Sequence, residues 1–263
     1  MRYGFEGDRR PMSDFSIASR GAAAAALIAG ATLLCGFTFR PGGPPELHYK
    51  DYNVRPPRGN TVSVCHAHGC QQQESFTFTH ADISDLSVLM DYVRGSGSPA
   101  RERRAIAYAI GWMESRVGPA TGTANDRAGL SFMNASGQLD CVDEATNTTS
   151  YLLVLADNGL LRHHVVIRPY SKASFFKWPH FAAMIKERRS GRVYAVDSFF
   201  GPNGANPVIL LASKWYIEDY EFALAPSPYR QPVAEYKNDN IGQLVEQILR
   251  DNPGSSRAPM AAK

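Results

Sequence analysis

The pattern of apolar and polar positions divides the chain into an uncharged N-terminal segment, a polar connection and a region of mixed helices and strands. Apolar residues recur at helical spacing in three segments, 81–93, 99–117 and 240–249, and Gly118-Pro119 predicts the end of the second helix. Short β-rich runs predict strands at 61–64, 71–78, 160–167 and 207–211. These elements place one folded domain at 61–250, followed by a tail at 251–263 that we expect to be disordered.

Residues 21–39 form an uncharged stretch of about 19 residues, close to the ~20 that span a bilayer as a helix. Arg20 directly before it is typical of a cytoplasmic n-region, which we assign to residues 1–20. We therefore predict a signal peptide or an uncleaved membrane anchor. The domain would then lie in a bacterial periplasm, held at the inner membrane or released by cleavage. Lipidation at Cys35 is an alternative, although Leu34 stands where such sites normally carry a small residue.

The connection at 40–60 carries several prolines and glycines, which predict an extended and poorly packed linker. Such a linker would set the folded domain away from the membrane.

A cysteine stands at the predicted start of another helix, which runs from Cys141 to a stop at Asn158-Gly159. Exposed N–H groups and the positive end of the helix dipole lower the pKa of a thiol at this place and favour the thiolate. The same N–H groups can hold an oxyanion, and Gln138 is a candidate for a further donor. The pattern indicates a nucleophile at Cys141.

Two β-rich runs flank the polar turn Arg188-Arg189-Ser190-Gly191, which predicts a hairpin. His180 opens the first strand and Asp197 closes the second. Antiparallel pairing brings the start of one strand beside the end of the other, so we expect these two residues to be neighbours. If the helix of Cys141 packs on this sheet, the three residues can serve as nucleophile, base and orienting carboxylate.

This ordered set resembles transglutaminase-like proteins, and most of all the bacterial transglutaminase-like cysteine proteinases. Their nucleophile stands in an Asp-Cys-x-Asp segment, here Asp140-Cys141-Val142-Asp143. The resemblance covers residues 122–215 and implies an α+β, papain-like fold with the catalytic helix packed on an antiparallel sheet. It also implies cleavage of a peptide or amide bond in a protein or peptide substrate through an acyl-enzyme, with no cofactor required. Deamidation and acyl transfer use the same intermediate and stay open.

Some members of that family bind calcium through acidic residues on both sides of the nucleophile. Asp140 fits the first position, whereas Val142 stands at the second and leaves Asp143 as the candidate replacement. A hard cation needs several oxygen ligands, so calcium at Asp140 and Asp143 is an expectation that the structure must test. Trp178, in the aromatic segment before His180, is a candidate substrate-binding residue.

The chain has four cysteines, at positions 35, 65, 70 and 141. Cys65 and Cys70 are near neighbours, and a small disulfide loop between them would suit an oxidising compartment outside the cytoplasm. The alternative is a zinc site built from Cys65, His66, His68 and Cys70. Four ligands within six residues do not readily form a tetrahedron, so the spacing favours the disulfide. Cys141 is then left without a partner, as a nucleophile requires.

The composition is that of an ordinary globular protein, with 44% hydrophobic and 20% charged residues. A formal net charge of +3, without a basic run interleaved with aromatics, argues against nucleic acid as a partner. Besides the thiol hydrolase, a non-catalytic periplasmic binding module on the same scaffold remains an alternative. The presence of Cys141, His180 and Asp197 together argues against that module, because binding alone needs none of the three.

Overall fold

The structure is a computed structural model that describes residues 39, 41–127, 135–174, 177–217, 247 and 250, without the side chains of 173, 174, 177 and 178. The described residues from Pro41 onward belong to one compact unit. The predicted membrane segment, apart from residue 39, the tail at 251–263 and most of the last predicted helix lie outside the described residues. In the described part of the chain, no helix has the length and apolar character that a bilayer crossing requires.

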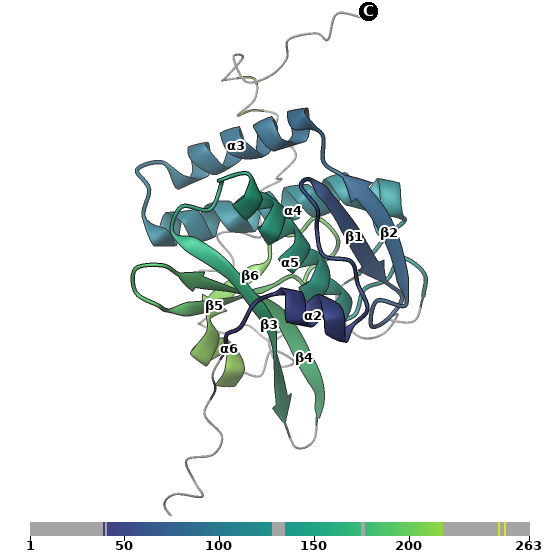
Figure 1. The fold of residues 1–263 in the computed structure, drawn as a ribbon. Helices are drawn as coiled ribbons and strands as arrows, with labels where there is room; N and C mark the ends of the chain where they lie inside the picture. The colour runs from purple at the N-terminus through teal and green to yellow at the C-terminus, as the bar shows by residue number, and fades with distance from the viewer. Residues whose placement is uncertain are drawn as a thin grey trace, which may run out of the picture. The chain divides into compact units, whose positions relative to one another are not determined.

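The domain is α+β, with two antiparallel sheets and a helix between them (Figure 1). The first sheet pairs β1 (Thr61–His66) with β2 (Gln72–Thr77). The second has the order β3-β4-β5-β6, formed by His164–Ser174, Lys177–Glu187, Val193–Asp197 and Val208–Leu211. The helices are α2 (Glu46–Asp51), α3 (His80–Arg94), α4 (Pro99–Thr121), α5 (Cys141–Asp157) and α6 (Ala212–Ile217). α5 contacts β1 of the first sheet and β3, β4 and β5 of the second.

The main core lies where α4, α5 and both sheets meet. One face of α4 repeats apolar residues at helical spacing, and all of them are buried: Ile106, Ile110, Met113 and Val117. They pack with Leu152 and Leu155 of α5 and with Ile185 and Val196 of the second sheet. The helical spacing in the sequence therefore marks the face that is removed from water, which is the dominant stabilising term for such a domain.

α4 is longer than the sequence pattern predicts, because it continues through Gly118-Pro119 to Thr121. A proline in the last turn removes only one backbone donor, and the Oγ1 of Thr121 donates to the carbonyl of Val117 at 3.1 Å. The helix ends at Gly122, which has a φ of 78°, a left-handed conformation that glycine adopts without steric cost.

The predicted hairpin is confirmed, since β4 and β5 pair antiparallel with Ala183 opposite Val196. Asp197 is the last residue of β5, as expected, whereas β4 begins at Lys177, three residues before His180. The register places His180 just beyond the last paired residues, near the end of β5 that carries Asp197.

The linker predicted at 40–60 is wrong at α2, where the chain forms a helix that folds onto α5. Tyr49 of α2 is 2% exposed, and its hydroxyl lies 2.8 Å from the Oγ of Ser150. His48 places its Nε2 2.8 Å from the Oγ1 of Thr146. Proline and glycine content predicted an extended chain, but the docking surface for these side chains lies about 100 residues away in sequence, where local composition gives no signal.

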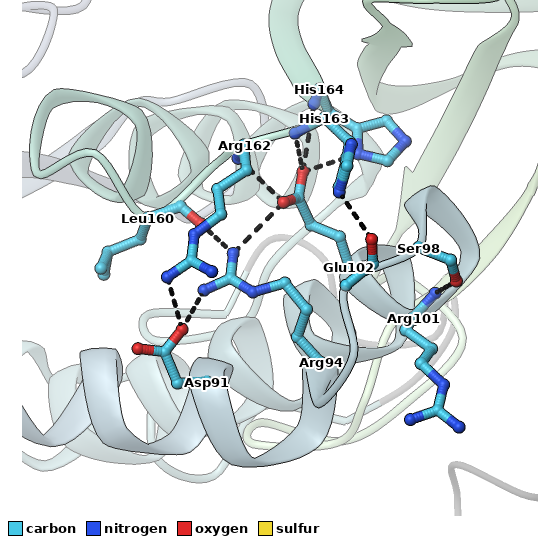
Figure 2. Close-up of polar contacts among 10 residues, drawn as sticks. Asp91, Arg94, Ser98, Arg101, Glu102, Leu160, Arg162, His163 and His164 are labelled. Atoms are coloured by element: carbon cyan, nitrogen blue, oxygen red, sulfur yellow. Dashed lines mark hydrogen bonds and ion pairs between the residues drawn. The ribbon is translucent and has the colours of Figure 1, made fainter.

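A buried ionic network connects α3, α4 and the start of β3 (Figure 2). Glu102 is fully buried and accepts hydrogen bonds from the guanidinium of Arg94 at 3.2 Å and from the Nδ1 of His164 at 2.9 Å. Backbone N–H groups of Arg162, His163 and His164 add three more. Burial acts to raise the pKa of Glu102, but the bonds to His164 and to these N–H groups lower it to about 2.

The network gives the adjacent His163 and His164 structural roles. His164 bonds to Glu102, while the Nε2 of His163 lies 3.1 Å from the carbonyl oxygen of Gly97. His164 lies opposite Glu187, at the end of β4 that is remote from His180.

Replacing Glu102 by glutamine tests this network. Glu102→Gln removes the charge that balances the buried Arg94, so we expect the free energy of unfolding to fall by about 3 kcal/mol or more. Urea unfolding at neutral pH measures the loss. Asp51→Asn, which breaks the exposed ion pair with Arg168, is the control and should cost less than about 1 kcal/mol. Equally small losses in both variants would contradict a network that stabilises the fold.

Candidate active site

Cys141 is the first residue of α5, and a capping box shapes the turn around it. The Oδ1 of Asp140 accepts from the N–H groups of Val142 at 2.9 Å and Asp143 at 2.8 Å. The Oδ2 of Asp143 accepts from the N–H of Asp140 at 3.0 Å. The thiol is partly exposed, and its Sγ lies 3.6 Å from the carbonyl oxygen of Pro179. The start of α5 therefore faces β4 beside His180.

His180 and Asp197 form a hydrogen-bonded pair with 2.7 Å between the Nε2 of His180 and the Oδ2 of Asp197. The Asp197 side chain is 2% exposed. Because Nε2 faces Asp197, Nδ1 is the ring nitrogen left for Cys141, which lies close enough to raise the pKa of His180. The structure thus brings Cys141, His180 and Asp197 together in the arrangement that the sequence analysis expects.

The surroundings of His180 favour its protonated form. Burial lowers the pKa of the ring, but the charge and hydrogen bond of Asp197, together with Cys141, outweigh it and raise the pKa of His180 to about 9. At neutral pH an imidazolium is therefore favoured next to Cys141.

Three aromatic rings lie close to the imidazole of His180. The ring centroids of Phe199, Phe200 and Trp215 lie 5.2, 5.2 and 5.8 Å from that of His180. The indole N–H of the fully buried Trp215 donates to the Oδ2 of Asp197 at 2.8 Å. These rings reduce access of water to the His180–Asp197 bond, which strengthens it electrostatically.

Sequence reasoning gave Trp215 and the two phenylalanines no role at the site. The available signal was that Phe199-Phe200 directly follows Asp197 and that a buried tryptophan needs an acceptor for its N–H.

Tyr52, at the end of α2, belongs to the same apolar cluster as Cys141 and was also missed. Its ring lies 4.8 Å from that of His48 and 6.0 Å from that of Phe181, measured between centroids. Burial, followed by the charges of Cys141 and Asp140, raises the pKa of Tyr52, so the phenol keeps its proton at neutral pH. Tyr52 was missed because it lies in the segment predicted as a linker.

The calcium site expected at Asp140 and Asp143 does not fit the structure. The Oδ1 of Asp143 accepts from the N–H of Cys70 at 2.6 Å, and its Oδ2 accepts from the N–H of His68 at 3.0 Å. The Oδ2 of Asp140 accepts from the N–H of Gly69 at 3.1 Å and lies 2.9 Å from the Nδ1 of His68. Together with the capping box, these bonds occupy every oxygen of both carboxylates, so a cation would have to displace backbone donors.

The N–H groups of His68, Gly69 and Cys70 belong to the loop that the Cys65–Cys70 disulfide closes. The φ angles of residues 67–70 are 65°, 70°, 65° and 61°, all left-handed, and only Gly69 is a glycine. Such a conformation costs roughly 1 kcal/mol or more for each of the other three residues. In return, successive N–H groups converge on the carboxylates as an anion-binding turn. The disulfide takes both sulfurs, so the alternative zinc site has lost its thiolate ligands.

The two predicted substrate-binding residues have different outcomes. The Nε2 of Gln138 donates to the carbonyl of Asn125 at 2.9 Å, and its Oε1 accepts from the N–H of Arg127 at 3.2 Å. Its amide is thus bonded within the loop before the helix. The backbone of Trp178 belongs to β4, while its side chain lies outside the described residues.

Buried carboxyl groups lie behind the first turn of α5. Burial raises the pKa of Glu114 to about 8 and that of Asp126 to about 6. Burial, and then the charges of Glu114 and Asp126, raises the pKa of Glu144 as well. Glu114 accepts from the N–H of Gly204 at 3.0 Å, and Asp126 accepts from the N–H of Leu139 at 2.7 Å. Asp126 therefore holds the approach to Cys141 through Leu139, while the raised pKa of Glu114 favours its protonated form at neutral pH.

Comparison with known proteins identifies no relative: no protein-family model, no curated protein and no solved structure matches the chain. The geometry of the site is thus the basis for any functional conclusion.

Trp215→Phe tests the support of Asp197, because it keeps an aromatic ring while removing the N–H that donates to the carboxylate. We expect the free energy of unfolding to fall by about 2 kcal/mol, since a buried charged acceptor loses a partner. Urea unfolding measures the change. Tyr216→Phe, at the neighbouring half-exposed position, is the control and should be close to the parent. A Trp215→Phe protein as stable as this control would contradict the role of the indole N–H.

Glu114→Gln tests the buried acid, because glutamine imitates a protonated carboxyl group. Folding raises the pKa of Glu114 from its ordinary 4.5 to about 8. The stability that its proton contributes is therefore complete below pH 4.5 and is lost as the pH rises through about 8. We expect thermal unfolding to show a larger gain for the variant at about pH 9 than at about pH 5. The control is Glu74→Gln on exposed β2, and an equal gain at both pH values would contradict the raised pKa.

Proposed function

We propose that the domain is a thiol hydrolase of transglutaminase-like, papain-like fold that cleaves a peptide or amide bond in a protein or peptide. The observation that carries the proposal is the arrangement around His180. Its Nε2 is bonded to the buried Asp197 at 2.7 Å, and its other ring nitrogen is left for Cys141 at the start of α5. The packing of α5 on an antiparallel sheet and the Asp-Cys-x-Asp segment agree with it.

In this mechanism the thiolate of Cys141 attacks the carbonyl carbon of the bound amide, and the developing oxyanion accepts a hydrogen bond from the backbone N–H of Cys141. The imidazolium of His180 then donates its Nδ1 proton to the leaving amine, and the carbon–nitrogen bond breaks. Water attacks the resulting thioester, with neutral His180 as its base, and releases the acid. Asp197 keeps the ring oriented and stabilises its charged form.

The proposal includes the cellular compartment of the enzyme. We place the enzyme in a bacterial periplasm, with residues 21–39 as its membrane segment or cleaved signal. The Cys65–Cys70 disulfide supports an oxidising compartment, because such bonds persist mainly outside the cytoplasm. The small net charge of +3 supports a polypeptide substrate over a nucleic acid.

Alkylation of Cys141 by limiting iodoacetamide tests the proposal in the full chain. Peptide mass spectrometry separates the Cys141 label from that of Cys35. We expect labelling of the parent to persist at about pH 6, far below the ordinary thiol pKa of roughly 8.5, because the imidazolium stabilises the thiolate. His180→Gln should slow labelling at that pH by about tenfold or more.

His163→Gln is the matched control, because it changes a histidine that is bonded to Gly97 and remote from the thiol. It should label like the parent. Labelling that follows an ordinary thiol titration and ignores His180 would contradict a catalytic Cys141 and favour the binding module.

A further inference from the structure

The loop closed by Cys65 and Cys70 is anchored to α5 at two levels. At the first turn, the N–H groups of His68, Gly69 and Cys70 bind the carboxylates of Asp140 and Asp143 at 2.6–3.1 Å. One turn further along, Asn147 accepts from the N–H of Cys65 at 2.7 Å and donates to the carbonyl of Cys65 at 2.9 Å. The loop is thus a backbone clamp on the helix that presents Cys141.

The clamp depends on a conformation that an open chain has little reason to adopt. Ala67, His68 and Cys70 all have positive φ, in one run with Gly69. Side chains disfavour this region, so an unconstrained segment leaves it and its N–H groups turn away from one another. A bond between Cys65 and Cys70, which brings their Cα atoms to 4.5 Å, removes the extended alternatives.

Loss of the clamp would act directly on the thiol. Asp140 and Asp143 are 4% and 0% exposed, and without the loop they would lose three backbone donors while remaining beside Cys141. A poorly compensated carboxylate at Asp140 disfavours a further negative charge on the adjacent sulfur. The cap that fixes the first turn would also loosen, and with it the position of the thiol relative to His180.

We propose that closure of the Cys65–Cys70 disulfide activates Cys141, so that the chain acquires its reactive thiolate only after oxidation. This regulation rests on the proposed function, in which that thiolate is the nucleophile. In the closing step the thiolate of one cysteine attacks a sulfur of an external disulfide, and the thiolate of the other displaces the mixed disulfide. Cys65 and Cys70 lose two electrons and two protons, and the external disulfide leaves as two thiols.

Because the Cys65–Cys70 bond is buried once formed, its closure is a one-way maturation step. Cys65 and Cys70 are 0% and 4% exposed in the closed form, so a reductant has little access to the finished bond. In a reducing compartment Cys141 would remain an unactivated thiol. The same chain would gain its activity in a compartment where disulfides form.

The test is the double variant Cys65→Ser, Cys70→Ser in the full chain, with Cys141 alkylation followed at about pH 6 by peptide mass spectrometry. We expect labelling about tenfold or more slower than in the oxidised parent, with cooperative thermal unfolding retained. Tyr49→Phe is the matched control, because it removes a different buried hydrogen bond to α5 and leaves the loop intact. It should label like the parent.

A second measurement uses the parent alone, refolded with a dithiol and then oxidised by a small disulfide. Labelling of Cys141 should be slow before oxidation and fast after it, with circular dichroism of a folded protein in both states. Fast labelling in the double variant or in the reduced parent overturns the proposal, and so does loss of the fold in both, since the bond would then serve stability alone. If the oxidised parent itself lacks His180-dependent labelling, the proposed function fails instead.

Discussion

The site depends on the hydrogen bonds that two carboxylates at the start of α5 accept from backbone N–H groups. Asp140 and Asp143 cap the helix, and the same side chains accept three backbone N–H groups from the disulfide loop. Burial and the neighbouring Asp140 raise the pKa of Asp143 to about 7, against the effect of its N–H donors. The two carboxylates therefore lie beside the thiol with every oxygen bonded to a donor, while His180 lies on its other side.

The rest of the domain is assembled on α5 by a buried polar run. The helix interior carries Thr146, Asn147, Thr148, Thr149 and Ser150, all buried. Thr146 and Ser150 bind the two α2 residues His48 and Tyr49, Asn147 binds β1, and Thr148 lies 3.0 Å from the hydroxyl of Ser198 after β5. Because a buried hydroxyl or amide must find a partner, Thr146, Asn147, Thr148 and Ser150 each specify which segment docks at that level of the helix, whereas Thr149 donates to the carbonyl of Ala145 within α5.

The sequence predicted what local patterns determine. The start of α5, the β4–β5 hairpin and the meeting of His180 with Asp197 follow from capping, turn and strand signals near those residues. The sequence prediction failed where a residue bonds to a segment that is remote in the sequence. Tyr52 and α2 were hidden by a proline-rich composition, and the calcium expectation failed because Asp140 and Asp143 are satisfied by a loop about 70 residues earlier. Trp215 was overlooked because its acceptor, Asp197, already had a role.

The most direct test of the thiolate–imidazolium pair is the ultraviolet absorbance of the thiolate, recorded against pH for the oxidised chain and for Cys141→Ser. The difference between the two proteins isolates the charge on Cys141 without any substrate or alkylating agent. We predict one equivalent of thiolate already at about pH 6. This absorbance should disappear in acid, when the thiolate of the pair takes up a proton. A difference that appears only near the ordinary thiol pKa of roughly 8.5 would contradict it.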